Sequence, residues 1–114
     1  MAVHIARHLF TVDEYYKMAE NGVLTEDSRV ELIDGEIIDM PPIGSGHAST
    51  VERTGDRLRP FLGAASTLRT QQPIRIAVRS EPEPDLAIVR RRDDCYATAH
   101  PTPPDVLLLV ARQG

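Results

Sequence analysis

The sequence predicts a single α/β domain in which helices flank a β-sheet. Its 114 residues suffice for one domain with one modest core. Hydrophobic residues make up 41% of the chain, yet it contains only two Phe, three Tyr and no Trp, so Val, Ile and Leu must fill that core. Short apolar runs alternate with helix caps and turn signals. We expect residues 1–114 to form this one domain and residues 1–9 to be a flexible N-terminal tail.

The first element is a predicted helix that begins after Thr11. The run Thr11-Val12-Asp13-Glu14 has the pattern of a capping box, in which the Thr hydroxyl accepts from a first-turn amide and the Glu side chain reaches back to the cap. Gly22 suits the left-handed position that ends many helices. A helix over about 12–21 follows.

A β-hairpin comes next. Residues 30–33 and 36–40 are strand-forming and flank Asp34-Gly35, a pair that tolerates the positive φ angles of a type I′ turn. Counting across this turn pairs Glu31 with Ile38 and places Glu31 on the same face as Ile33 and Glu36. One acidic side chain of each strand therefore lies among apolar neighbours.

The second half of the chain is predicted to supply one more helix and the main strands. A helix over 47–62 would bury Val51, Leu58, Phe61 and Leu62. Extended segments at 67–70 and 74–78 form either a strand pair or one strand bulged at Pro73, and 85–90 is a strand. Residues 105–110 are apolar except for the first, which is typical of a strand buried on both faces in the middle of a sheet.

Charge, cysteine content and hydropathy restrict the class of protein. A formal net charge of −4 argues against a general nucleic-acid coat protein, because such binding depends on many Lys and Arg contacts with phosphates. A local basic patch stays compatible with this charge. The single cysteine, Cys95, excludes an internal disulfide and a multi-cysteine zinc site. No apolar run approaches the ~18–20 residues of a membrane span, so we expect a cytoplasmic protein without a membrane partner.

Two carboxylates are the best candidates for chemistry. Asp85 follows Pro84 at the start of an apolar strand, where a side chain can face a cleft while the core holds its backbone. Mg²⁺ prefers oxygen ligands and commonly takes one or two carboxylates, and Glu31 on the hairpin could supply the second. The alternative is that Asp85 caps the turn after Pro84 and that Glu31 pairs with an Arg of a neighbouring strand.

Histidine and arginine side chains offer weaker signals. His47 near the start of the second helix could act as a general acid or base, since the reference pKa of histidine is near 6.5, or it could be a packing or capping residue. The run Arg90-Arg91-Arg92 could contact phosphate, but Asp93-Asp94 follows at once, which favours a solvated loop.

Six segments, in order, resemble the Uma-two family of endonucleases. They are Thr11-Val12-Asp13-Glu14-Tyr15-Tyr16, Val30-Glu31-Leu32-Ile33-Asp34-Gly35-Glu36-Ile37, Met40-Pro41-Pro42, His47, Glu83-Pro84-Asp85-Leu86-Ala87-Ile88-Val89 and Pro104-Asp105-Val106. The resemblance implies a restriction-endonuclease-like core of the PD-(D/E)xK type with a mixed sheet. It also implies hydrolysis of phosphodiester bonds in DNA with Mg²⁺ or Mn²⁺, with Asp85 and Glu31 as metal ligands and with His47 as a further catalytic candidate.

The chain departs from this family after its last predicted strand. The family places a third carboxylate there and a Lys further on, whereas this chain reads Val110-Ala111-Arg112-Gln113-Gly114 and ends. Ala111 takes the place of the carboxylate in this comparison. We therefore expect a fold that is incomplete at its C-terminus and an enzyme with weak or absent turnover. The alternative is a non-catalytic remnant that acts as an interaction or homodimerisation module, because truncation would uncover an unpaired strand edge.

Overall fold

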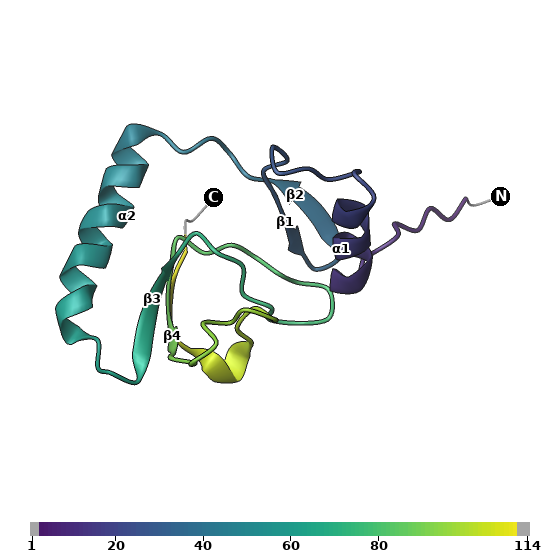
Figure 1. Cartoon of the computed structure of the whole chain (residues 1–114). Helices are drawn as coiled ribbons and strands as arrows, with labels where there is room; N and C mark the ends of the chain where they lie inside the picture. The colour runs from purple at the N-terminus through teal and green to yellow at the C-terminus, as the bar shows by residue number, and fades with distance from the viewer. Residues whose placement is uncertain (1–2, 112–114) are drawn as a thin grey trace.

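The computed structural model describes residues 3–111 and contains two α-helices and two antiparallel sheets (Figure 1). This architecture confirms the predicted α/β class. In the described residues the strands form two separate sheets, β1-β2 and β3-β4-β5, rather than one mixed sheet. The helices and strands are α1 (Val12–Glu20), β1 (Val30–Ile33), β2 (Glu36–Asp39), α2 (Ser45–Leu58), β3 (Ser66–Thr70), β4 (Leu86–Arg90) and β5 (Val106–Val110).

Helix α1 begins at the predicted capping box. The Thr11 hydroxyl accepts from the Glu14 N–H at 3.2 Å, and a Glu14 carboxylate oxygen accepts from the Thr11 N–H at 2.9 Å. This second hydrogen bond stabilises the ionised carboxylate and so lowers the pKa of Glu14. Val12 is fully buried, and Gly22 follows the helix with a φ of 77°.

The β1-β2 hairpin has the predicted register, with Glu31 opposite Ile38. Asp34 and Gly35 have φ angles of 48° and 84°, as a type I′ turn requires. The turn also supports the N-terminal segment, because the Phe10 N–H donates to the Gly35 carbonyl at 2.9 Å. A Cβ atom on Gly35 would lie only 2.6 Å from the Leu9 Cβ, so this contact requires glycine.

Residues 79–83 lie along strand β1 and attach the hairpin to the rest of the chain. The Gly35 N–H donates to the Arg79 carbonyl, and the Glu81 N–H donates to the Leu32 carbonyl, each at 2.8 Å. The Asp34 N–H donates to the Ser80 hydroxyl, also at 2.8 Å. Strand β4 begins a few residues later, so these bonds place its first residues next to the hairpin.

The three-stranded sheet is covered on one face by α2, which lies beside β3 in Figure 1. A Cβ atom on Gly55 of α2 would lie 3.4 Å from Leu68 and 3.8 Å from Leu86, so the helix packs closely on β3 and β4. Residues from β4 and from the loops form a buried cluster: Ile74, Ala87, Val89 and Tyr96. Leu86 packs against α2 and Ala87 belongs to the buried cluster, so neighbouring residues of β4 face two packed surfaces.

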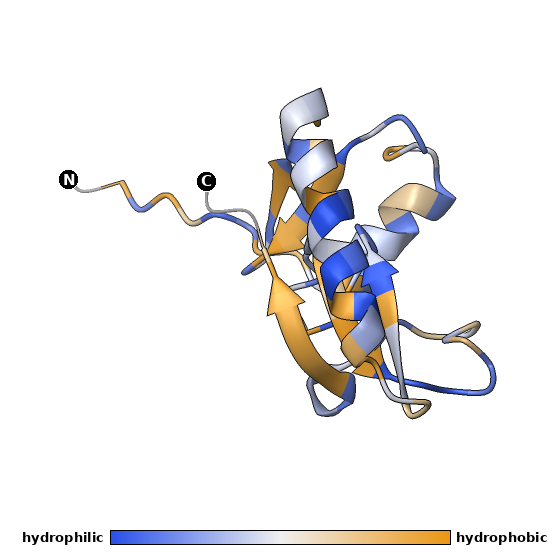
Figure 2. Ribbon diagram, turned by 90° about the vertical axis from the view of Figure 1, so that its left-hand side faces the viewer, coloured by the Kyte–Doolittle hydropathy of each residue, from blue (hydrophilic) through white to orange (hydrophobic). Residues whose placement is uncertain are grey.

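Strand β5 contradicts the prediction of a central buried strand. Within residues 3–111 it pairs only with β4, which makes it an edge strand. Leu107 is 64% exposed, and Leu108 and Leu109 are each 43% exposed. In Figure 2 the strand that leads to the C-terminus is coloured as hydrophobic along its length. An apolar run thus identified a strand but not its place in the sheet.

Two further predictions in this half were wrong. Phe61 is 86% exposed, because α2 ends at Leu58 and the following 3-10 turn at Arg59–Phe61 directs its side chain to solvent. Residues 74–78 form no strand, although Ile74 is fully buried. The Ile74 N–H binds the carbonyl of Pro82 and the Arg75 N–H that of Pro101, so loop carbonyls replace a strand partner.

Among the described helices, none is long and apolar enough to cross a membrane.

Candidate functional site

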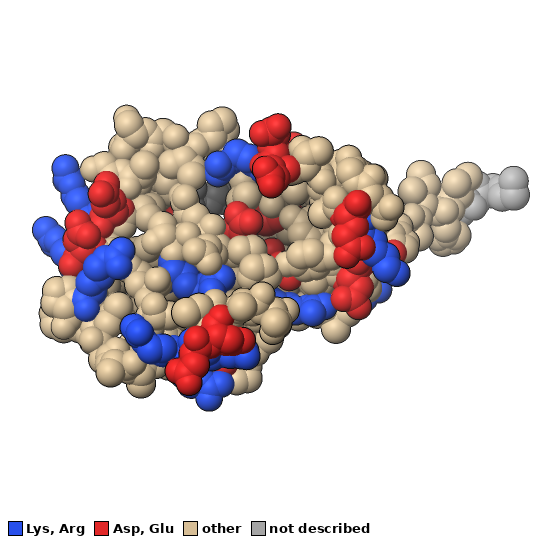
Figure 3. Space-filling view, viewed as in Figure 1, with Lys and Arg blue, Asp and Glu red and all other residues tan. Residues whose placement is uncertain are grey.

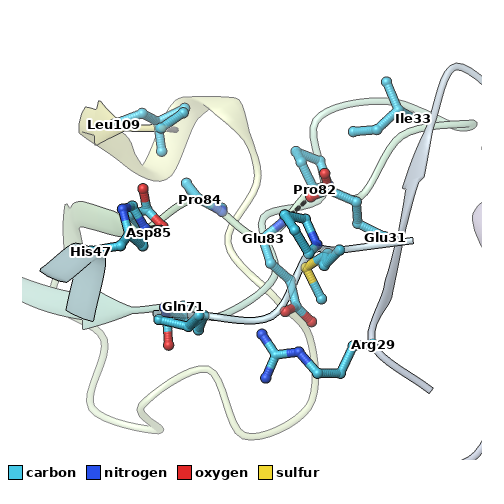
Figure 4. Close-up of a pocket in the computed structure, with 14 residues that line it drawn as sticks. Arg29, Glu31, Ile33, His47, Gln71, Pro82, Glu83, Pro84, Asp85 and Leu109 are labelled. Atoms are coloured by element: carbon cyan, nitrogen blue, oxygen red, sulfur yellow. Dashed lines mark hydrogen bonds and ion pairs between the residues drawn. The ribbon is translucent and has the colours of Figure 1, made fainter. Parts of the chain in front are cut away.

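A pocket of about 300 Å³ lies between the hairpin and the three-stranded sheet (Figure 4). Each of the three candidate residues chosen from the sequence, Glu31, His47 and Asp85, lines it. They come from β1, from α2 and from the residue just before β4. The remaining lining residues include Arg29, Gln71, Pro82, Glu83, Pro84, Leu109 and Ala111.

Asp85 and His47 form one end of the pocket. The His47 Nε2 lies 3.1 Å from the Asp85 Oδ1, and their side chains are only 25% and 14% exposed. The Asp85 carbonyl accepts from the Gln71 N–H at 3.0 Å, which fixes the backbone where β3 ends and β4 begins. Of the two oxygens of the Asp85 carboxylate, Oδ1 has a hydrogen-bond partner among the described residues and Oδ2 has none there. The other oxygen is thus left for a ligand.

Glu31 and Glu83 form the other end. One carboxylate oxygen of Glu31 accepts from the Glu83 N–H at 3.0 Å. Burial raises the pKa of Glu83, the negative charge of Glu31 raises it further, and Arg29 opposes both effects. Burial also raises the pKa of Tyr15, and the charges of Glu83 and Glu31 add to that effect. This end of the pocket therefore has a negative potential that only Arg29 partly offsets.

Glu83 was not among the residues selected from the sequence. A signal for it exists in Glu83-Pro84-Asp85, because the two carboxylates lie two residues apart on a segment that proline keeps extended. Only the pairing of residues 79–83 with β1 brings Glu83 next to Glu31, however, and that pairing joins segments some fifty residues apart.

The structure brings Glu31 and Asp85 to one pocket but gives each a different partner. Figure 4 shows the two pairs at opposite ends, with Pro84 between them. Within residues 3–111, no group of three or more His, Cys, Asp or Glu side chains is arranged to hold a metal ion. The donor chemistry nevertheless suits Mg²⁺ or Mn²⁺, which often take one or two carboxylates and complete their coordination with water and phosphate oxygens.

Strand β5 contributes apolar side chains to the pocket. Leu109 lies near Asp85 in Figure 4, and Ala111, where the sequence comparison places the missing carboxylate, also lines the cavity. Neither side chain can ligate a cation. The predicted departure that involves residues 112–114 lies outside the described residues.

Comparisons with known proteins identify the family of the chain. No curated protein and no solved structure matches the chain. Residues 12–111, nearly the whole chain, match the family model Uma2, whose description is "Putative restriction endonuclease". The helices, hairpin and three-stranded sheet are consistent with the restriction-endonuclease-like fold expected from that description. As the motifs around Glu31 and Asp85 predicted, this chain belongs to the Uma2 family.

Proposed function

We propose that this protein is a metal-dependent endonuclease that hydrolyses phosphodiester bonds in DNA. The observation that carries the proposal is that Glu31 and Asp85, which are far apart in sequence and belong to the motifs shared with the family, line one pocket. That pocket has space of about 300 Å³ and offers oxygen donors on two sides. Such a site suits a cation together with a phosphate group.

In this proposal Asp85 and Glu31 would hold a Mg²⁺ or Mn²⁺ ion. A bound divalent ion supplies neutralisation of phosphate charge and activation of water for attack on phosphorus. The fixed backbone of Asp85, held by Gln71, limits how far its carboxylate can move. The Glu83 N–H restrains the Glu31 carboxylate in the same way. Both restraints reduce the entropy lost when a ligand binds.

His47 has the position of a proton carrier and of an orienting group. Its Nε2 donates to the Asp85 Oδ1 at 3.1 Å, which holds that carboxylate in one orientation. When Nε2 carries this proton, Nδ1 is left to accept a proton from water or from an alcohol. We propose His47 for both tasks.

Cleavage of supercoiled plasmid in the presence of Mn²⁺ tests this function. The parent should nick the plasmid slowly, and Asp85→Asn and Glu31→Gln should each abolish nicking, because each removes an anionic oxygen donor. Asp27→Asn is the matched control, since Asp27 is exposed on a loop away from the pocket. Nicking that survives Asp85→Asn, or that the control removes as well, would contradict the proposal.

We expect turnover to be weak, because the apolar side chains of Leu109 and Ala111 line the pocket and supply no oxygen donor. A third oxygen donor at the pocket wall would strengthen the binding of a cation.

The cytoplasmic location and the single-domain boundaries with a flexible segment at residues 1–9 stay predictions.

A second candidate function is a non-catalytic interaction module that forms a homodimer. The exposed leucines of the edge strand β5, Leu107 to Leu109, favour it. An edge strand presents unpaired N–H and C=O groups, and an apolar one readily pairs with a second copy. Light scattering with size exclusion tests this candidate: a dimer that Leu107→Lys converts to monomer would support it, and a parent that is monomeric at every concentration would contradict it.

A further inference from the structure

A second cavity, of about 380 Å³, lies beside the candidate site and contains two arginine side chains at one aromatic ring. The guanidinium carbon of Arg69 is 5.4 Å from the centre of the Tyr96 ring, and that of Arg92 is 5.1 Å from it. Arg91 and Gln72 line the same cavity. We call Arg69, Arg91, Arg92 and Tyr96 the arginine cluster.

The ring of Tyr96 is held firmly in place. Its hydroxyl donates to the Arg90 carbonyl, and its N–H donates to the Asp94 carboxylate at 3.3 Å. Tyr96 and Cys95 both have left-handed φ angles, of 57° and 53°, a conformation that non-glycine residues rarely adopt. Tyr96 is 7% exposed, because it also belongs to the buried cluster of the sheet. The arginines therefore rest on a rigid support.

The three arginines of the run Arg90-Arg91-Arg92 have different surroundings. Arg90 makes an ion pair with Asp105 at 2.7 Å, and this partner is only 10% exposed, so Arg90 has a structural partner. Arg92 pairs with Asp94 at 3.0 Å, and Arg91 donates to the Ser66 carbonyl at 3.4 Å. Asp93 also lines the cavity. Arg91 and Arg92 face the cavity, so the run is more than a solvated loop.

Arg69 carries the charge that has no counterpart. Among the described residues it makes no ion pair, and its Nε is buried without a hydrogen-bond partner. A buried donor without an acceptor is unfavourable, and two guanidinium groups at one ring repel each other. Asp94 neutralises only the Arg92 charge. An anion in the cavity that both arginines line would offset the charge of Arg69 and would accept hydrogen bonds from guanidinium N–H groups.

Strand β3 and the two residues that follow it contribute side chains to both the arginine cluster's cavity and the candidate pocket. Gln71 lines the pocket that contains Asp85, and the next residue, Gln72, lines the cavity of the arginine cluster. Arg69 lies on β3 two residues before Gln71. Figure 3 shows basic side chains in small groups, several of them next to acidic ones, and no continuous basic stripe on the visible face.

We propose that the arginine cluster binds a phosphate of a DNA backbone and places the next phosphates at the Asp85 pocket. This inference rests on the proposed function, because it assigns the substrate contact of that same site. Guanidinium groups match phosphate geometry through paired N–H bonds, which an ammonium group cannot do. The binding is independent of base sequence, since all its contacts go to the backbone.

Fluorescence anisotropy with a short labelled DNA duplex, in EDTA and at low salt, tests the proposal. Arg92→Gln and Arg69→Gln should each weaken binding and lower the slope of log affinity against log salt by about one. Arg53→Gln is the matched control: it removes the same charge from the exposed surface of α2. Arg92 is 42% exposed, so we expect Arg92→Gln to fold even if Arg69→Gln does not. Circular dichroism verifies the fold of both variants.

Three outcomes would overturn the inference: no duplex binding by the parent, an equal loss of affinity in Arg53→Gln, and inorganic phosphate that binds as tightly as the duplex. The last would identify a site for free phosphate. An inactive parent that shows the expected arginine effects would defeat only the proposed nuclease, whereas plasmid nicking without those effects would defeat only the arginine cluster.

Discussion

The two ends of the candidate pocket hold their carboxylates in different ways. Asp85 accepts a hydrogen bond from a side chain, that of His47, whereas Glu31 accepts one from the backbone N–H of Glu83. A second carboxylate lies near Glu31 and none is paired with Asp85. The Asp85 end thus has a partner that can itself take or give a proton, and the Glu31 end is a concentration of negative charge suited to a cation.

This difference indicates a division of labour within one cavity. The His47 side chain orients the Asp85 carboxylate, while a bound positive charge would offset the repulsion between Glu31 and Glu83. Each end depends on a different part of the fold: the first on α2 and β4, the second on the hairpin and residues 79–83. The two ends can therefore be altered separately by mutation.

The largest expected effect comes from the turn that holds the Glu31 end. Gly35→Ala should reduce the free energy of unfolding by about 2–4 kcal/mol, because its Cβ would lie 2.6 Å from the Leu9 Cβ at a φ of 84°. Gly22→Ala is the control: its φ is 77°, but no atom lies within 4 Å, so only the backbone cost of about 1–2 kcal/mol remains. Urea unfolding measures both. Equal losses would mean that the contact with Leu9 is unimportant.

Removal of the Asp85 partner should affect cation binding. We expect His47→Ala to weaken Mn²⁺ binding about 10- to 100-fold, because the carboxylate loses the hydrogen bond that orients it. Titration calorimetry gives the dissociation constant. His4→Ala serves as control, since His4 is exposed in the N-terminal segment. Unchanged Mn²⁺ binding in His47→Ala would show that the hydrogen bond to Asp85 is unimportant for the cation, and tighter binding would show that His47 competes with the cation for Asp85.

An added carboxylate on β5 should strengthen the Asp85 end. Leu109→Glu places an oxygen donor on the pocket wall near Asp85, and we expect the dissociation constant of Mn²⁺ to fall about tenfold, or about 1.4 kcal/mol. Leu108→Glu is closely matched, because both leucines are 43% exposed and Leu108 does not line the pocket. The rise in melting temperature with added Mn²⁺ reports the difference. A similar rise in both variants would show that β5 does not complete the site.

The smallest expected effect is the contribution of Glu83 to the pH dependence of stability. Its pKa is raised above the ordinary 4.5, so the folded state binds this proton more tightly than the unfolded state does. The contribution to stability is fully present below pH 4.5 and is lost as pH rises through the folded pKa. Glu83→Gln should therefore raise the melting temperature slightly at pH 7 and leave it unchanged at pH 4.

Thermal melts at the two pH values measure this effect, with the exposed Glu26→Gln as control. Stabilisation of equal size at both pH values would contradict the electrostatic explanation, because the charge of Glu83 is absent at the lower pH. Destabilisation at pH 7 would mean that the attraction between Glu83 and the charge of Arg29 outweighs the cost of burial and the repulsion by Glu31.

Elements whose signals lie within a few residues could be predicted from the sequence. The capping box at Thr11 and the turn at Asp34-Gly35 satisfy their hydrogen bonds locally, and both formed as expected. The strand at 106–110 was recognisable, but its composition could not reveal that only β4 pairs with it. Residues 74–78 alternate like a strand, yet their N–H groups bind distant loop carbonyls.

The same distinction applies to the site. The motifs identified Glu31, His47 and Asp85, and the structure brings them to one pocket. The contact of Asp85 with His47 and that of Glu31 with Glu83 join residues 38 and 52 positions apart. Such pairings depend on how α2 and residues 79–83 pack, which no local pattern specifies.

The short segment from Glu83 to Asp85 limits the dimensions of the pocket. The Glu83 N–H binds Glu31, and Asp85 follows only two residues later, across Pro84. Two residues of chain span at most about 7 Å, and prolines on both sides of Glu83 keep the segment stiff. The chain length between Glu83 and Asp85 thus limits how far apart the two acidic ends can lie, and insertion of one residue next to Pro84 would raise this limit.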